Sequence, residues 1–151
     1  MKTRDDYEMF LAHVRQATGL DAFAADDGGL VCVCVDDTYN VNLQFIGATG
    51  RVLCFVEVAT LPADAPAAAY RELLAAGLFG AETAGGYFAL EPETGTVVYN
   101  YLFDLEEAAL DVEGFVLTLE KIIELCDAWS GRIKGGVEEK DESHVFDYRA
   151  V

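Results

Sequence analysis

The sequence lacks the residue patterns that most enzymes use for covalent chemistry. Of its 151 residues only two are serines, and neither Ser130 nor Ser143 lies in the strand-to-helix turn that exposes a nucleophile. No GxxxxGK[ST] or GxGxxG run occurs, so nothing predicts a loop that cradles phosphates. These absences argue against an enzyme, and we expect no catalytic residue, no cofactor and no requirement for ATP.

Cysteine and histidine, the usual ligands of zinc, are also few. The chain has four cysteines, at Cys32, Cys34, Cys54 and Cys126. No CxxC pair occurs, and the two histidines, His13 and His144, are isolated, so a zinc site would need an unusual ligand set. We interpret the cysteines as free thiols that fill small apolar spaces, and we predict no metal site.

Positive charge and long apolar runs are scarce as well. Ten Lys and Arg residues stand against 27 Asp and Glu, and the resulting net charge of −17 repels nucleic acid and anionic lipid. No apolar run approaches the ~20 residues of a membrane span, and the acidic N-terminus is unlike a signal peptide. The chain is nevertheless 52% hydrophobic. We therefore expect a folded cytoplasmic protein with a basic or neutral partner, although acidity that only maintains solubility explains the charge equally well.

Hydrophobic periodicity and turn residues predict an α+β fold. We expect an antiparallel five-stranded twisted sheet with three helices, in the order α-β-β-β-α-β-β-α. The predicted elements are a helix at 4–18, strands at 30–35, 39–46 and 51–59, a helix from Asp64 to Gly80, strands at 87–91 and 96–103, an acidic connector at 105–110 and a helix from about 111 to Gly135. Residues 1–134 then form one domain, and residues 135–151 form an acidic, flexible tail.

The third strand carries an unusual combination of side chains on one face. Leu53 and Phe55 share that face with Glu57, which is not expected to be buried without a partner. The face should therefore be partly solvated, and apolar residues on a wet face are typical of a protein-binding patch. The alternative is that a helix covers Leu53 and Phe55 while Glu57 lies at its rim.

The second helix is apolar nearly all round. Its large apolar residues are Tyr70, Leu73, Leu74 and Leu78, and alanines fill most other positions. Such a helix is usually buried on both sides, and in a domain this small a second copy of the chain can supply the other side. We predict a homodimer with these four residues at its interface.

Three segments carry a family resemblance: LLAAGLFG at 73–80, GYFALEPETGTVVY at 86–99 and LEKIIELCDAW at 119–129. With the element order, size and acidity, they make the chain similar to the class I type III secretion chaperones, the family of the translocated-intimin-receptor chaperone. The resemblance implies a homodimer that binds the extended N-terminal segment of a secreted effector and keeps it secretion-competent without ATP. It assigns client binding to five apolar residues: Tyr7, Phe10, Leu11, Leu53 and Phe55.

Two alternatives to a secretion chaperone stay open at the level of sequence. One is a protein-binding or regulatory domain outside secretion that uses the same fold. The other is a small enzyme with a non-standard site, which a deep pocket of charged groups with shifted pKa values would favour.

Overall fold

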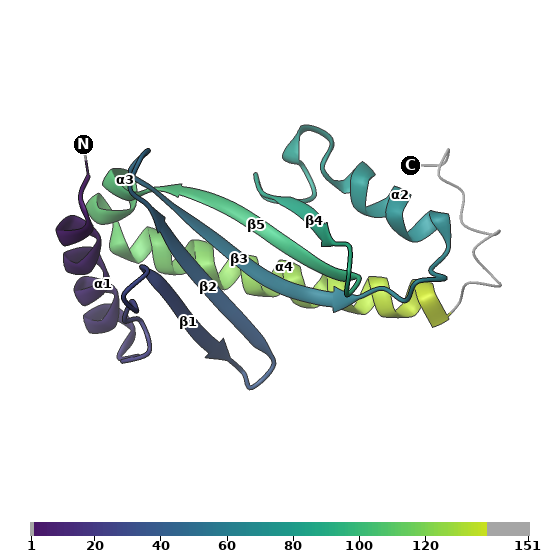
Figure 1. The fold of residues 1–151 in the computed structure, drawn as a ribbon, viewed down its shortest axis with the longest axis horizontal. Coiled ribbons are helices and arrows are strands. Elements are labelled where there is room, and N and C mark those ends of the chain that lie inside the picture. The colour runs from purple at the N-terminus through teal and green to yellow at the C-terminus, as the bar shows by residue number, and fades with distance from the viewer. Residues whose placement is uncertain (1, 139–151) are drawn as a thin grey trace.

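The computed structural model describes residues 2–138. It contains one sheet with helices packed on one face and beside one edge (Figure 1). The elements are α1 (Arg4–Thr18), β1 (Leu30–Val35), β2 (Tyr39–Ile46), β3 (Arg51–Thr60), α2 (Ala67–Ala76), the 3₁₀ turn η1 (Leu78–Gly80), β4 (Tyr87–Glu91), β5 (Thr96–Asp104), α3 (Leu105–Leu110) and α4 (Val112–Glu138). The α+β class, the five-stranded antiparallel sheet and the order of its main elements are confirmed.

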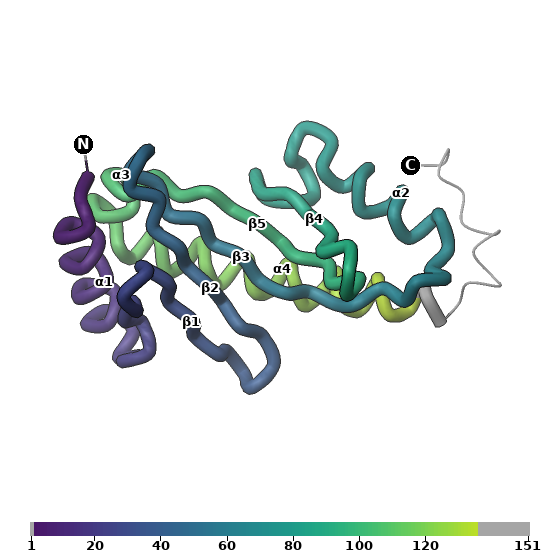
Figure 2. Tube along the Cα trace, viewed as in Figure 1, coloured from purple at the N-terminus to yellow at the C-terminus, as the bar shows by residue number. Residues whose placement is uncertain are grey.

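The five strands lie in the order β1-β2-β3-β5-β4, and every neighbouring pair is antiparallel. The trace in Figure 2 shows the first three strands as a meander joined by short turns. β5 returns beside β3, and β4 pairs only with residues 96–100 of β5. The second half of β5 therefore has a strand partner on one side only.

The helix α1 begins and ends where its capping residues predict. The Thr3 side chain accepts a hydrogen bond from the Asp6 backbone N–H, and the Asp6 carboxylate accepts one from the Thr3 backbone N–H in return. The backbone hydrogen bond from Thr3 is the main reason that the pKa of Asp6 lies below its ordinary value. Gly19 ends the helix with a φ of 73°, a left-handed conformation that glycine adopts without strain.

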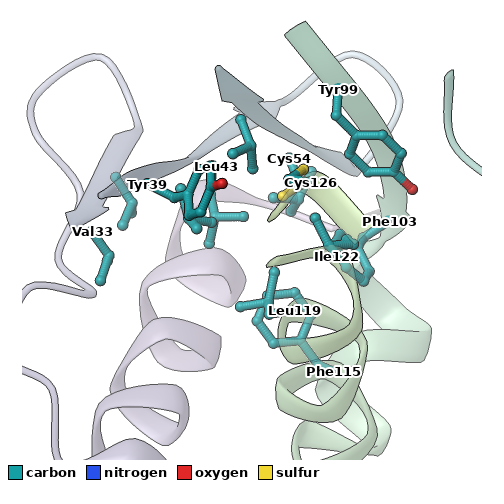
Figure 3. Packing of buried hydrophobic residues seen from close by; sticks show 14 of the residues in the cluster. Val33, Tyr39, Leu43, Cys54, Tyr99, Phe103, Phe115, Leu119, Ile122 and Cys126 are labelled. Carbon is teal, nitrogen blue, oxygen red and sulfur yellow. The ribbon is translucent and has the colours of Figure 1, made fainter. Parts of the chain in front are cut away.

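The core lies between one face of the sheet, here called the inner face, and the helices α1 and α4. Alternate residues of β2 and β3 point inward, so that Val41, Leu43, Cys54 and Val56 are almost completely buried. Figure 3 shows side chains of the sheet and of α4 meeting in this layer. The α4 stripe that faces the sheet consists of Phe115, Leu119, Ile122, Cys126, Trp129 and Ile133, all buried. The long apolar stripe of the last helix is thus explained by packing on the sheet.

Several predicted boundaries were wrong, and the second helix ends at Ala76, before the 3₁₀ turn η1, and not at Gly80. Asp64 is not the N-cap of α2, because the helix begins only after Pro66, and a residue that precedes proline is disfavoured in helical conformation. The acidic connector at 105–110 is the short helix α3, which Asp104 caps by accepting a hydrogen bond from the Glu107 N–H. The last helix continues past Gly135 to Glu138, and the predicted tail beyond that residue lies outside the described part of the chain.

None of the helices in residues 2–138 combines the length and apolar character needed to cross a bilayer.

Candidate functional site

The face of the sheet opposite the core, here called the outer face, carries an apolar patch. Leu53 of β3 lies directly opposite Leu102 of β5, and Phe55 lies opposite Asn100, which in turn pairs with Tyr87 of β4. Leu102 and Tyr87 are 42% and 53% exposed, and Leu53 and Phe55 are partly exposed. We call these four apolar residues the outer patch. No helix in the described part of the chain packs over it, since α4 runs behind the sheet (Figure 1).

Charge at the margin of the outer patch agrees with a solvated face. Glu57 is exposed, two residues after Phe55 along β3. On the β2 side the neighbours are the polar residues Asn42 and Gln44, and the Asn42 amide donates a hydrogen bond to the Phe55 carbonyl oxygen. The prediction that this face is partly solvated is confirmed, and the alternative of a covering helix is wrong for residues 2–138.

The three residues of the first helix that were assigned to client binding lie in the core. Tyr7, Phe10 and Leu11 are each at most 1% exposed. The Tyr7 hydroxyl donates a hydrogen bond to the Gly29 carbonyl oxygen, and the Phe10 ring meets Phe115 edge-on at 4.9 Å. Side chains without accessible surface do not contact a partner while the fold is intact, so we remove these three from the binding surface. Their helical spacing reflects packing.

A second apolar surface lies where α2 approaches β4, and we call it the α2–β4 surface. Three of the four predicted interface residues, Tyr70, Leu73 and Leu74, line a groove of about 160 Å³ against Phe88 and Leu90. Tyr70 and Leu73 are half-buried against the core, whereas Leu74 is 80% exposed. The fourth residue, Leu78, lies outside the groove lining but is also exposed. The helix is therefore covered on one side and open on the other.

The residue after Leu78 is Phe79, which the sequence showed as the end of the apolar run but which was not assigned to the interface. It is 94% exposed and holds a left-handed φ of 58°, a conformation that is uncommon for residues other than glycine. The signal was present in the LLAAGLFG run, where Phe79 is the last large apolar residue before Gly80. The chain therefore exposes a further large apolar side chain directly after the exposed Leu78.

A third apolar surface is a groove of about 390 Å³ between the end of α1, the β1–β2 hairpin and α4. We call it the α1–α4 groove. Its apolar lining comprises Ala17, Leu20, Phe23, Val35, Val41, Val116, Leu119 and Ile123. Four separate segments contribute to it, which explains why no local pattern in the sequence revealed it.

The groups whose pKa shifts most are two cysteine thiols and two tyrosine hydroxyls that are buried in the core. Burial raises the pKa of the Cys54 and Cys126 thiols to about 12, and burial also raises the pKa of Tyr7 and Tyr99. Such groups stay protonated at neutral pH and are poor nucleophiles. Among residues 2–138, no three His, Cys, Asp or Glu side chains come together as metal ligands would.

Two of the cysteines are not core filler as predicted. Cys54 and Cys126 are buried, but Cys32 and Cys34 of the edge strand β1 are exposed on the outer face. The CxC spacing correctly indicated that the two thiols share a face. It did not show which face, because β1 carries apolar residues on both sides.

The fold and these surfaces together define a protein-binding module, in which apolar surfaces surround a small sheet. The model of the Tir chaperone protein (CesT) family matches residues 9–130, and the chain belongs to that family. No curated protein sequence matches the chain significantly.

Solved structures with a similar fold are complexes of two proteins. The ExsC–ExsE complex matches with a TM-score of 0.72 and 20% identity, over 86% of this chain and 95% of that one. The HopA1–SchA chaperone–effector complex matches at 0.64 and 20%, over 86% and 94%. The ExoU–SpcU heterodimer from the type III secretion system of Pseudomonas aeruginosa matches at 0.59 and 17%, over 87% and 97%. At these identities the likeness shows a shared fold.

Proposed function

We propose that this protein is a cytoplasmic, homodimeric chaperone that binds the N-terminal segment of a type III secretion effector and keeps it secretion-competent without ATP. The family supports a chaperone of this kind, and the similar solved structures are complexes with effectors or other protein partners. The proposal also includes that the chain performs no catalysis.

The observation that carries the proposal is the outer patch. Leu53, Phe55 and Leu102 lie together on a sheet face that no described helix covers, beside the exposed Glu57. Three large apolar side chains exposed in one place do not stabilise the fold of a domain. In a binding protein, each of them can be buried against the partner. Full burial of one such side chain contributes roughly 1.5–3 kcal/mol.

The α2–β4 surface serves as the dimer interface in this proposal. Leu74, Leu78 and Phe79 are exposed on consecutive turns of one segment, and a groove lies beside them for side chains of the second copy. A twofold axis through this surface would leave the outer patch and the α1–α4 groove of both copies free for a client.

The client is held in extended form. Different parts of such a segment can place side chains in the α1–α4 groove and on the outer patch, and the segment can add backbone hydrogen bonds at free strand edges. This mode of binding needs neither nucleotide hydrolysis nor a covalent step.

The test is calorimetry with the client's N-terminal segment, after the client has been identified by pull-down and mass spectrometry. Phe55→Asp should weaken binding at least tenfold, or ~1.4 kcal/mol, because it removes an anchor and buries a charge. Asn40→Asp is the matched control: it adds the same charge to the same sheet face at an exposed site and should leave affinity unchanged. Deletion of the gene should also lower secretion of the client.

Equal affinity of Phe55→Asp and wild type would remove the outer patch from the site, and a dependence of binding on ATP would contradict the mechanism. A client whose export does not depend on this protein would favour a binding domain outside secretion.

A further inference from the structure

In Figure 1, β4 runs beside only part of β5. The part of β5 that β4 leaves unpaired borders a cleft of about 300 Å³. The cleft lies between this strand end, α3 and the first two turns of α4. Its lining comprises Tyr101, Leu102, Phe103, Asp104, Glu107, Ala108, Asp111, Gly114, Phe115 and Thr118. None of these residues was assigned to a site from the sequence, and only Leu102 belongs to the outer patch.

Alternate backbone N–H and C=O groups in residues 101–104 of β5 point toward the edge that β4 leaves unpaired. A Cβ at Gly86 would lie 2.4 Å from the Asn100 carbonyl oxygen, so this oxygen points toward β4. Backbone direction alternates along a strand, so the N–H and C=O of Leu102 point to the same side, beyond Tyr87, the first residue of β4 and the one that pairs with Asn100. In residues 2–138, no turn or loop backbone group bonds to Leu102 in place of β4. An unpaired strand edge is a template for an additional strand.

The side chains around this edge determine which kind of side chain from a binding partner fits the cleft. The inner wall is aromatic, with the Phe103 ring 4.7 Å from Tyr101 and 4.6 Å from Phe115. The rim carries three carboxylates, Asp104, Glu107 and Asp111, and no basic residue lines the cleft. An aromatic wall with an anionic rim suits the stem and the head of a lysine or arginine side chain.

These carboxylates have no cationic partner within the described residues. Asp104 and Asp111 accept hydrogen bonds from the backbone N–H groups of Glu107 and Gly114, and each retains further acceptor capacity. Arg51 lies opposite Asp104 in the β3–β5 register, yet none of the ion pairs in residues 2–138 joins it to this rim. A positively charged side chain from a partner protein could therefore form ion pairs with these carboxylates.

We propose that an extended segment of a partner protein adds as a strand to the free edge of β5 and places a lysine or arginine side chain in the cleft between β5, α3 and α4. This subsite rests on the proposed chaperone function and specifies one position of the client. The backbone pairing supplies affinity for any extended segment, and the carboxylates favour a basic residue at that position.

The direct test uses the full chain and two blocked peptides, Ac-Thr-Val-Thr-Arg-Thr-Val-Thr-amide and the same peptide with norleucine in place of arginine. Backbone NMR shifts on titration should map to residues 101–105 and α3, and the Leu102 amide should exchange more slowly with solvent. The arginine peptide should bind about fivefold or more tightly than the norleucine peptide, and added salt should reduce that ratio.

Two charge-neutralising variants of α3 distinguish an effect of the cleft carboxylates on peptide binding from an effect of the overall negative charge. Glu107→Gln should lower the advantage of the arginine peptide about threefold, as expected for one partly screened carboxylate. Glu106→Gln is the matched control, because Glu106 is exposed one residue earlier on the same helix and does not line the cleft. It should leave the ratio unchanged. Both variants avoid the capping carboxylates, so both should fold as wild type does.

Equal binding of the two peptides, shifts at the β1 or β4 edge, or equal effects of the two variants would overturn the subsite. These results do not depend on the chaperone function. A client that is lost with Phe55→Asp but unaffected by Glu107→Gln would retain the chaperone and reject the subsite. Peptide binding at the cleft together with a client insensitive to Phe55→Asp would retain the subsite and remove the outer patch from the client-binding site.

Discussion

The Tyr39 hydroxyl at the start of β2 donates a 2.8 Å hydrogen bond to the Asp127 carboxylate on α4. The two residues are 88 positions apart in the sequence. Burial of the ring, and then this bond, raise the pKa of Tyr39 above its ordinary value. The bond joins the free end of the β1–β2 hairpin to the long helix that packs on the inner face of the sheet.

Tyr39→Phe should therefore lower the free energy of unfolding by about 1–2 kcal/mol, because it deletes a bond to a charged acceptor and keeps the buried ring. Urea denaturation measures the loss. Asp127→Asn keeps an acceptor at the same place and should cost less. A phenylalanine variant as stable as wild type would show that solvent competes for this bond.

Phe10→Ala should lower the free energy of unfolding by about 3–5 kcal/mol, because it empties a buried site beside Phe115. Its neighbour Met9 is 63% exposed, and Met9→Ala is the control, expected within about 0.5 kcal/mol of wild type. If Phe10→Ala instead retained stability and lost client binding, α1 would return to the binding surface.

Two thiols should react rapidly with Ellman's reagent in the native protein, and four should react after denaturation. Cys32 and Cys34 are exposed, whereas burial holds the pKa of Cys54 and Cys126 at about 12 and shields both sulfur atoms. Cys32→Ala together with Cys34→Ala should abolish the fast reaction. Four fast thiols would contradict the placement of the core, and stoichiometric zinc in the purified protein would contradict the prediction of no metal site.

Leu74→Asp should convert the proposed dimer into a folded monomer. Leu74 is 80% exposed, so a charge there costs the isolated chain little but would be buried in a dimer built on the α2–β4 surface. Light scattering should give twice 16.4 kDa for wild type and 16.4 kDa for the variant, with unchanged circular dichroism.

The matched control for that variant is Leu110→Asp, at a leucine of α3 that is 83% exposed and remote from α2 (Figure 1). It should remain dimeric. Leu73→Asp is expected to differ from both, because Leu73 is half-buried against the core and a charge there should lower stability itself. A wild-type monomer of normal solubility would contradict the dimer.

Local patterns in the sequence were sufficient for the class of fold and for most element boundaries. The Thr3 and Asp6 capping residues, the alternation along β2 and the apolar stripe of α4 each act over one turn or one strand, so they can be read without knowing what lies opposite. The charge of Glu57 also indicated, from one residue, that the face bearing Leu53 and Phe55 is solvated.

What an apolar residue packs against is decided only by tertiary structure. Phe10 and Phe55 look alike in the sequence, yet α4 covers the first and no described helix covers the second. The α1–α4 groove and the cleft beside β5 are each assembled from separate segments, and the strand edge beside the cleft is free because the pairing of β4 with β5 ends at Asn100. Periodicity determines that a residue has an apolar face, but the approach of distant elements determines whether that face becomes core or surface.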